Sequence, residues 1–351
     1  MGTVMTDAPG SERSGSRARL VIAAVLLAMM LVATAFAALV AWDASRDLTD
    51  VREDVDTLVG PTRALQLVGA LQDERTYAAT YLLGIENAIE QPVDSIDEAT
   101  AATDEAVAAF RSDVDRRGGA LADAYGPVLS GIDDPLAGLR ESVGAVTGER
   151  SISQDEATQP IFAGYTTLVA DLLAAGDSMA LDIDDPELRQ GAQLLNRAAA
   201  QPELVGRIGR ELLLAGVSPG GRVSTPEQIA AIAADKAELL ANEAEIEGLA
   251  TGPYEDLAVD QAGADSLSEF LAVADESIEG ATVDLAGVTT SLGRTGDPAE
   301  RYGAMQDTVQ AQLADRAADL RDEAETRRTL WFVLAGAAAV AAAVTLVVLV
   351  R

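Results

Sequence analysis

The residues best able to do chemistry lie in one predicted helix, the segment PTRALQLVGALQDERTYAATYLLG at 61–84. At 100° per residue, an apolar stripe of this helix contains Ala64, Val68, Leu71, Ala79 and Leu82. Gln72 and Arg75 fall in the middle of the same stripe. A guanidinium fork matches a planar anion, and a glutamine amide adds a neutral donor. The spacing therefore indicates an internal site for a small anion, with Arg75 and Gln72 as ligands.

Arg75 has a second interpretation, because a charge centred on an apolar stripe must be compensated. It could form a buried ion pair with one of the many carboxylates, or reach solvent between helices. The same wheel places Asp73 on the opposite side of the helix, Glu74 on its flank, and Arg63 outside the core stripe and facing water. The sequence leaves both interpretations of Arg75 open.

Composition excludes most other chemistry. The 351 residues contain no histidine and no cysteine, so imidazole bases, thiolate nucleophiles and the usual zinc ligands are absent. Carboxylates are plentiful, but no pair has a glycosidase-like or metal-binding arrangement, and no phosphate-binding glycine motif occurs. We expect no enzyme activity, no catalytic or metal-ligating residues and no cofactor. A formal charge of -32 also disfavours nucleic acid as a partner.

Two apolar segments place the chain in a membrane. Residues 20–42 read LVIAAVLLAMMLVATAFAALVAW, 23 residues without a charge, and residues 330–350 read LWFVLAGAAAVAAAVTLVVLV. Each is long enough to cross a bilayer as a helix, and each has a tryptophan at one end, Trp42 and Trp331. We therefore predict two transmembrane helices, at 20–42 and 330–350.

Charges around the first span predict the topology. Three arginines in the predicted tail 1–19 precede this span, and acidic residues follow it. The positive-inside rule then puts the N-terminus in the cytoplasm and residues 43–329 outside the plasma membrane. Around the second span the rule is less clear, because Arg327 and Arg328 lie on its outer side. The alternative is a cleavable signal peptide ending near Ala35-Phe36-Ala37, although its apolar region would be long.

The region between the spans is predicted to be an acidic, all-α domain. Residues 43–329 hold 55 of the 57 acidic and 21 of the 25 basic side chains, a net charge of -34. Apolar residues recur at spacings of three and four, and strand-like alternation is scarce. Such a charge suits a domain that is exposed to solvent.

Internal similarity predicts that this domain is duplicated. The segment LVGALQDE at 67–74 recurs in outline as LVGRIGRE at 204–211. The offset is close to half of the domain, so we predict two coupled antiparallel four-helix bundles, in halves of about 43–185 and 186–329. The helix that begins near Pro298 has no breaker before Trp331 and should continue into the second span.

Turn chemistry predicts where the helices break. The predicted breaks are at Gly60-Pro61, Gln91-Pro92, Gly118-Gly119, Gly126-Pro127, Asp134-Pro135, Asp185-Pro186, Gln201-Pro202, Ser218-Pro219-Gly220-Gly221, Gly252-Pro253 and Asp297-Pro298. They divide the domain into about eight to ten helices of ordinary length.

Together these residues resemble a known family. A Leu-rich helix with a Q-x-E-R core at 72–75, Ala-rich helical pairs, a second related helix and two anchors resemble the nitrate- and nitrite-sensing domain of bacterial sensors. The arrangement is most similar to the extracytoplasmic version that precedes sensor histidine kinases in high-GC Gram-positive bacteria. The resemblance implies an all-helical domain of two coupled four-helix bundles that binds nitrate or nitrite between helices through arginines.

The resemblance carries over to individual positions. Gln72, Glu74 and Arg75 fit the motif, with Glu74 in an orienting role. The sequence departs from the family at Asp73, where members often have a further arginine. In the second half Arg210-Glu211 matches in part, and Leu212 stands where Arg75 would repeat. Arg210 and Arg207 are therefore further candidate ligands. The alternative is that both are solvated, because the wheel places Arg210 outward and Arg207 on the flank.

Function then follows from connectivity. A ligand that changes the arrangement of the helices leading into the two spans would be felt across the membrane. We expect a homodimer, and a two-component output in the cytoplasm, such as a histidine kinase, in the same chain or in a partner. A phospho-accepting histidine would have to lie beyond these residues. The alternative is a helical bundle at the cell surface that serves a structural role or binds proteins, without a small-molecule ligand.

Overall fold

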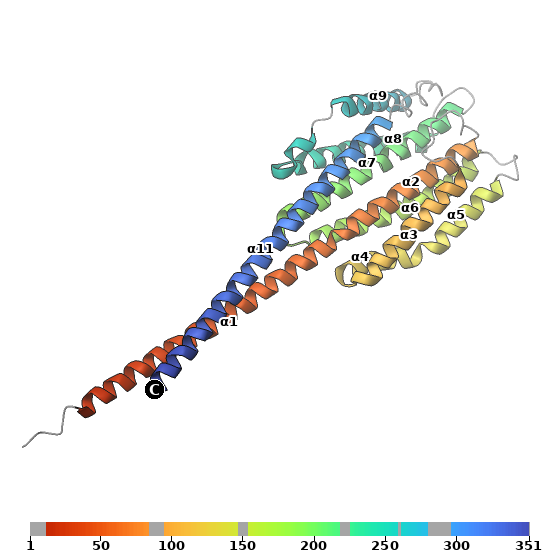
Figure 1. Cartoon of the computed structure of the whole chain (residues 1–351). Coiled ribbons are helices and arrows are strands. Elements are labelled where there is room, and N and C mark those ends of the chain that lie inside the picture. The colour runs from red at the N-terminus through yellow and green to blue at the C-terminus, as the bar shows by residue number, and fades with distance from the viewer. Residues whose placement is uncertain are drawn as a thin grey trace, which may run out of the picture. The chain divides into compact units, whose positions relative to one another are not determined.

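The computed structural model describes residues 12–83, 95–146, 154–217, 225–258, 261–279 and 296–350. In these ranges every regular element is a helix, so the all-α prediction is confirmed. The elements are α1 (Glu12–Thr57), α2 (Val59–Leu83), α3 (Ile96–Arg117), α4 (Gly119–Gly131), α5 (Asp133–Val146), α6 (Gln154–Leu181), α7 (Pro186–Val217), α8 (Pro226–Leu249), the 3₁₀ helix η1 (Gly252–Ala258), α9 (Gln261–Ile278) and α11 (Gly296–Val350) (Figure 1).

The chain divides into two compact units. One comprises residues 1–53 and 317–351, and the other comprises residues 54–316. Helices α1 and α11 contribute residues to both, and α11 runs unbroken through Trp331, as predicted from its lack of a breaker. By length and composition, two described helical stretches could span a membrane, Ala28–Ala79 and Arg301–Val347.

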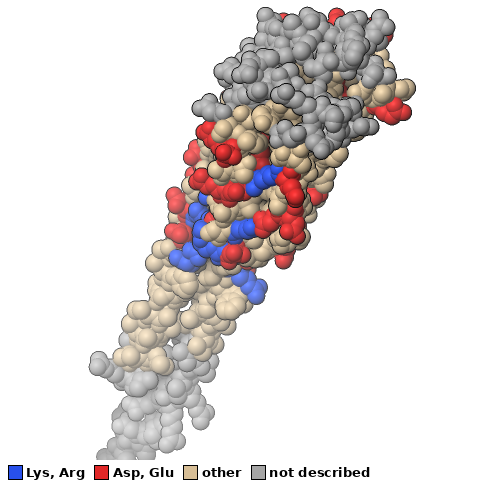
Figure 2. Space-filling view, turned by 90° about the vertical axis from the view of Figure 1, so that its right-hand side faces the viewer, with Lys and Arg blue, Asp and Glu red and all other residues tan. Residues whose placement is uncertain are grey.

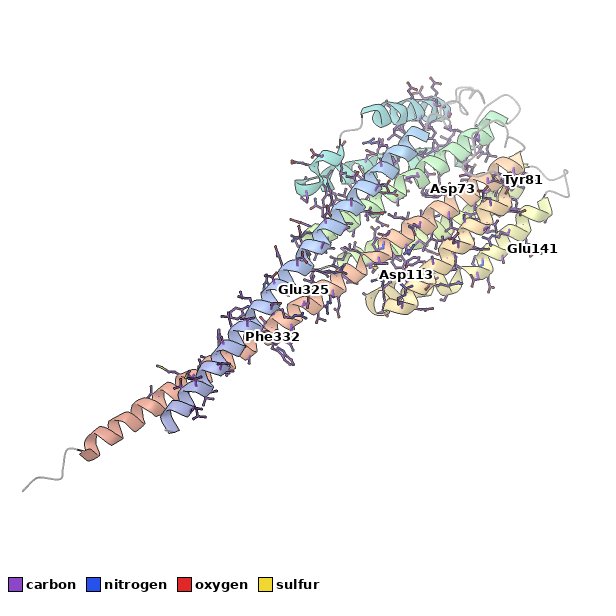
Figure 3. The ribbon with its side chains drawn as sticks, in the orientation of Figure 1. Asp73, Tyr81, Asp113, Glu141, Glu325 and Phe332 are labelled. Carbon is purple, nitrogen blue, oxygen red and sulfur yellow. The ribbon has the colours of Figure 1, made fainter. Side chains whose placement is uncertain are left out.

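The first unit contains many large apolar side chains that are exposed. On α1 they are Val25, Met29, Leu31, Val32, Phe36, Leu39 and Trp42, and on α11 they are Leu330, Phe332, Val333, Leu334, Val340, Val344, Leu346 and Val347. Phe332 on α11 is labelled in Figure 3. In a water-soluble protein, so many exposed apolar side chains would be unusual.

The second unit contains a core built by α2 to α6. Helix α2 packs against α3 and α6, and α4 and α5 also pack against α6. The largest fully buried side chains of this core are Leu67, Leu71, Phe110, Tyr125, Ile132, Tyr165, Leu172 and Met179. Gly60 is required at its edge, because a Cβ there would lie 2.6 Å from Leu121 Cδ1.

A separate core of the same unit is built by α7, α8 and α9. Its fully buried side chains include Ile208, Leu212, Ile232, Leu239 and Phe270. The two segments with similar sequence lie in different cores, and their apolar positions are buried in both: Leu67 and Leu71 in α2, Leu204 and Ile208 in α7. Helix α7 also packs against α2 and α6, so the two bundles meet along α7.

Acidic side chains are abundant on the surface. In Figure 2, Asp and Glu side chains gather in the middle of the face shown, with Arg and Lys side chains among them. Elsewhere in the described chain, charged side chains also form pairs across helices, such as Arg197 with Glu245 and Arg111 with Asp133. Solvent-exposed pairs of this kind add little stability, so the apolar cores must hold the fold together.

Most predicted helix breaks are found, and two are wrong. Gly118, Gly119 and Gly252 have positive φ angles and separate helices, and α7 begins at Pro186 as predicted. The predicted breaks at Pro127 and Pro202 are wrong, because α4 and α7 continue through these residues. The breaks predicted at Gln91-Pro92 and Ser218–Gly221 lie outside the described residues.

Packing explains why Pro202 does not end α7. A proline inside a helix removes one backbone hydrogen bond and normally bends the helix. Close to Pro202, side chains join α7 to α8: Asn242 Nδ2 of α8 donates to the Arg197 carbonyl at 2.9 Å, and Gln201 Nε2 of α7 donates to the Leu239 carbonyl at 3.4 Å. These contacts and the packing of α2, α6 and α8 against α7 hold the helix together on both sides of this residue.

The connection between α6 and α7 is held by residues of α1 and α11 at the two chain ends of the second unit. The Asp54 carboxylate of α1 accepts hydrogen bonds from the amides of Asp184 and Asp185, both at 3.1 Å. Asp185 caps α7 through the Leu188 amide at 2.9 Å, and its other oxygen accepts from Arg316 of α11 at 2.8 Å. We call Asp54, Asp185 and Arg316 the linker clamp.

The linker clamp should make stability depend on pH. Burial alone would raise the pKa of Asp185, but hydrogen bonds from Arg316 and from the Leu188 and Glu187 amides lower it below its ordinary value. A lowered pKa contributes stability above the unfolded pKa of about 4, and that stability is lost as the pH falls. Asp185→Asn should therefore lower the free energy of unfolding by about 1 to 2 kcal/mol at pH 7 and by less at pH 3. Thermal unfolding of the full chain in lipid nanodiscs measures this difference.

The matched control for this prediction is Asp184→Asn. Asp184 is adjacent in the chain and exposed. This variant should unfold like the original protein at both pH values. Equal destabilisation in the two variants would contradict the clamp.

Candidate functional site

Arg75 lies where the helical wheel predicted, on the buried face of α2. Its exposed fraction is 2 %, and Ala64, Val68 and Leu71 on the same face are also buried. The buried face is wider than the predicted stripe: Leu67, Glu74 and Ala78 are also buried, whereas Ala79 is only partly buried. The guanidinium of Arg75 is therefore held inside the protein by the helix that carries it.

The Arg75 guanidinium has a carboxylate partner on α7. Its Nη1 lies 2.5 Å from Glu203 Oε1 and donates to Thr166 Oγ1 of α6 at 3.0 Å. Gln72 Nε2, one turn earlier on α2, donates to the other oxygen of Glu203 at 3.4 Å. The ion pair that the sequence offered as the second interpretation is present, and it joins α2 to α7.

A second arginine lies beside the same aromatic ring. The Cζ atom of Arg75 is 4.5 Å from the centroid of the Phe162 ring, and the Cζ atom of Arg210 is 5.0 Å from it. Guanidinium groups at such distances are attracted by the ring face. We call Arg75 and Arg210 the arginine pair.

The sequence prediction that Arg210 points outward is wrong. Its side chain is only 10 % exposed, and it forms an ion pair with its neighbour Glu211. The wheel assumed that α7 has one buried face. Instead α2, α6, α8 and α9 all pack against α7, so the side opposite the α8–α9 core is covered as well.

Each arginine of the pair has a buried N–H group that remains available. Arg75 Nε and Arg210 Nη2 are buried and make no hydrogen bond to any of the described residues. A buried donor without an acceptor is costly, and it costs most on a charged group. Gly206 of α7 leaves room for this arrangement, because a Cβ there would lie 3.1 Å from Arg75 Nη2. The arginine pair can therefore donate hydrogen bonds to a small anion.

Glu74 belongs to a different cluster, and the flank of α2 on which it was predicted to lie is buried. Its exposed fraction is 0 %. Arg140 of α5 donates to both of its oxygens, at 2.7 and 3.1 Å, and Tyr165 of α6 donates to one at 2.8 Å. Burial alone would raise the pKa of Glu74, but hydrogen bonds from Arg140, Thr103 and Tyr165 lower it. Helices α5 and α6 cover this flank, so Glu74 holds helices together beside Arg75.

Arg207 and Arg63 form ion pairs elsewhere. Arg207 contacts Asp235 and Glu238 of α8, and its side chain is 30 % exposed. Arg63, which was predicted to face water, is 37 % exposed and forms an ion pair of 2.6 Å with Asp113 of α3. The structure brings Gln72, Arg75 and Arg210 to one place, and it places Arg207 against α8.

Comparison with known proteins identifies the family. A family model described as nitrate and nitrite sensing matches residues 66–343. The chain belongs to the nitrate and nitrite sensing family. The matched range contains Gln72, Arg75, Phe162, Glu203 and Arg210, and the family resemblance expected from the sequence is confirmed.

A solved structure of similar fold supports the architecture. The structure of the NasR transcription antiterminator aligns with a TM-score of 0.60 and 17 % identity, over 84 % of this chain and 82 % of that chain. At this identity the likeness concerns the fold alone. Among curated proteins, none matches this member of the nitrate and nitrite sensing family.

Asp73, next to the site, should oppose folding at neutral pH. Asp73 lies on α2, and Asp113, which serves below as its control, lies on α3 (Figure 3). Burial raises the pKa of Asp73 to about 6. The folded state then binds more protons than the unfolded state between about pH 4 and 6, so stability falls as the pH rises through this range.

Asp73→Asn removes the charge whose burial causes this cost. It should stabilise the full chain at pH 7.5 by about 1 to 2 kcal/mol and have little effect at pH 4, as measured by thermal unfolding. Asp113→Asn is the control of opposite sign, because the hydrogen bond from Arg63 lowers the pKa of Asp113. A loss of stability at pH 7.5 in Asp73→Asn would show that the carboxylate has a stabilising partner.

Proposed function

We propose that this chain is a membrane-anchored sensor that binds nitrate or nitrite at the arginine pair. One observation carries the proposal: two buried guanidinium groups lie over the Phe162 ring, and each has a buried N–H group that makes no hydrogen bond to the described residues. Membership in the nitrate and nitrite sensing family supports this choice of ligand. On this proposal the protein binds its ligand and does not transform it.

The chemistry of the site suits a small planar anion. Nitrate is trigonal and planar, and each of its oxygens accepts hydrogen bonds. A guanidinium presents its donors in a planar fork that matches such an acceptor, and hydrogen bonds between charged groups are roughly twice as strong as neutral ones. Arg75 Nε and Arg210 Nη2 could each donate to an anion held between α2 and α7, and Gln72 lies one turn away.

The acidic surface does not prevent this binding. Residues 43–329 carry a net charge of -34, which repels an approaching anion. At physiological salt this field is screened beyond about 8 Å, whereas two buried guanidinium groups act at contact distance.

The membrane part of the proposal rests on the two apolar segments. We propose that 20–42 and 330–350 cross the plasma membrane, with the N-terminus in the cytoplasm and 43–329 outside. Their exposed Leu, Val, Phe and Trp side chains would face lipid. The arginines before the first span support this orientation.

Transmission would pass through helices shared with these segments. Helix α7 carries Glu203 and Arg210, and it begins at the linker clamp, which contains Asp54 of α1 and Arg316 of α11. A ligand shifts such an equilibrium only by its different affinity for two arrangements. We propose that a change in α7 alters the clamp and hence α1 and α11. The output would be a cytoplasmic module, such as a histidine kinase, in cis or in trans, with the sensor acting as a homodimer.

Nitrate titration of the full chain in nanodiscs tests the ligand. Isothermal calorimetry at constant ionic strength, with chloride as the reference anion, should give saturable binding of nitrate or nitrite. Arg75→Lys should weaken it roughly tenfold or more, because an ammonium lacks the planar fork and one charge-assisted hydrogen bond is worth about 1.5 to 3 kcal/mol.

Arg207→Lys is the matched control, since Arg207 is also ion-paired but lies against α8. The affinity of the Arg207→Lys variant for nitrate or nitrite should remain within about twofold of the original protein's affinity, because this substitution removes no N–H group of the arginine pair. No heat with either anion would contradict the proposal. If Arg75→Ala then only destabilised the fold and a protein co-purified with the chain, a protein-interaction bundle would be the better account, since the Arg75–Glu203 pair is also an ordinary structural ion pair.

A further inference from the structure

Glu203 occupies one donor of Arg75, Nη1, beside the Nε donor that we propose binds the anion. Glu203 as a whole is 4 % exposed, and its carboxylate contacts Arg75 Nη1 at 2.5 Å and Gln72 Nε2 at 3.4 Å. These are the two side chains that the sequence pointed to as anion ligands. A carboxylate is itself a planar group with two acceptor oxygens. Glu203 therefore makes the contacts with Gln72 and Arg75 that would otherwise be available to a dissolved anion.

The negative charge of Glu203 beside the arginine pair affects how easily an anion can bind there. The arginine pair has two positive charges, and Glu203 and Glu211 contribute two negative charges as their ion-pair partners. A monovalent anion entering beside Arg75 would meet the Glu203 carboxylate at close range. Like charges at such distances repel strongly where little water separates them. Binding is therefore easier if Glu203 leaves Arg75.

Glu203 also joins the two bundles. Arg75 is on α2, which belongs to the first core, and Glu203 is on α7, which continues into the second core. Glu203 directly follows Pro202, where α7 lacks one backbone hydrogen bond. Among the contacts between α2 and α7, this ion pair is charged and buried on both sides, with exposed fractions of 3 % and 6 %. A change at Glu203 can thus alter how α7 is held against α2.

We infer that Glu203 is a tethered competitor that holds Arg75 in the ligand-free protein and is displaced when an anion binds. This inference rests on the proposed function and adds a residue that sets the affinity of the site. Exchange of the Glu203 carboxylate for the anion replaces a bond between α2 and α7 with a bond to the ligand. Glu203 thereby weakens binding and couples binding to movement of α7.

Glu203→Gln tests the inference in the full chain in nanodiscs. Glutamine keeps the length of the side chain and an acceptor oxygen for Arg75, but removes the charge. Sodium nitrate titrated by calorimetry should bind at least roughly tenfold more tightly than to the original protein, because the repelling charge is gone. Glu203→Asp keeps the charge on a shorter side chain, which holds Arg75 less closely. Its affinity for nitrate should therefore lie between those of the original protein and the Glu203→Gln variant.

Glu243→Gln is the matched control. Glu243 is a half-buried carboxylate on α8 that lies 4.0 Å from Arg301, and its removal changes the net charge equally. Its nitrate affinity should equal that of the original protein. Circular dichroism and thermal unfolding of each variant show whether it is folded before the titration is interpreted.

The outcomes separate this inference from the function on which it rests. If the original protein binds nitrate and folded Glu203→Gln and Glu203→Asp bind no more tightly, Glu203 is a structural partner of Arg75 and the inference is overturned. Equal tightening in Glu203→Gln and Glu243→Gln also overturns it, since general charge would then be the cause. If neither the original protein nor Glu203→Gln binds nitrate, the proposed function itself fails.

Discussion

Burial of the Arg75 guanidinium is the constraint on which the arrangement of helices around the site depends. An isolated charge in an apolar interior is very costly, so partners must surround it. They come from two helices: Thr166 and Phe162 belong to α6, and Glu203 belongs to α7. Satisfying one arginine of α2 therefore fixes α2, α6 and α7 together.

The same constraint connects the site to the ends of the unit. Helix α7 contains Glu203 near its middle and is capped by Asp185 at its start. Asp185 in turn contacts Arg316, and its amide is held by Asp54. A rearrangement at Arg75 thus has a continuous path of hydrogen bonds and helix to follow. The surface of this unit is acidic, whereas the arginine pair is buried.

Much of the fold follows from the sequence, and part of the site does not. The periodicity of α2 located Arg75 on a buried face, and glycines with positive φ located several helix ends. The wheel failed for Arg210, because it assumes one covered face whereas four helices cover α7, and it could not show that α5 and α6 bury the flank that carries Glu74. A helix break was also wrongly predicted at Pro202, because packing of several helices against α7 cannot be read from the local sequence. Glu203 and Phe162 carry no local signal, since only tertiary packing brings them to Arg75.

Anion binding at the arginine pair can be tested directly by a structure of the full chain determined in saturating nitrate. We expect nitrate oxygens at about 2.7 to 3.2 Å from Arg75 Nε and Arg210 Nη2, with the Glu203 carboxylate withdrawn from Arg75. Nitrate bound elsewhere, or an unchanged Arg75–Glu203 pair with no anion beside it at saturation, would contradict anion binding at this pair.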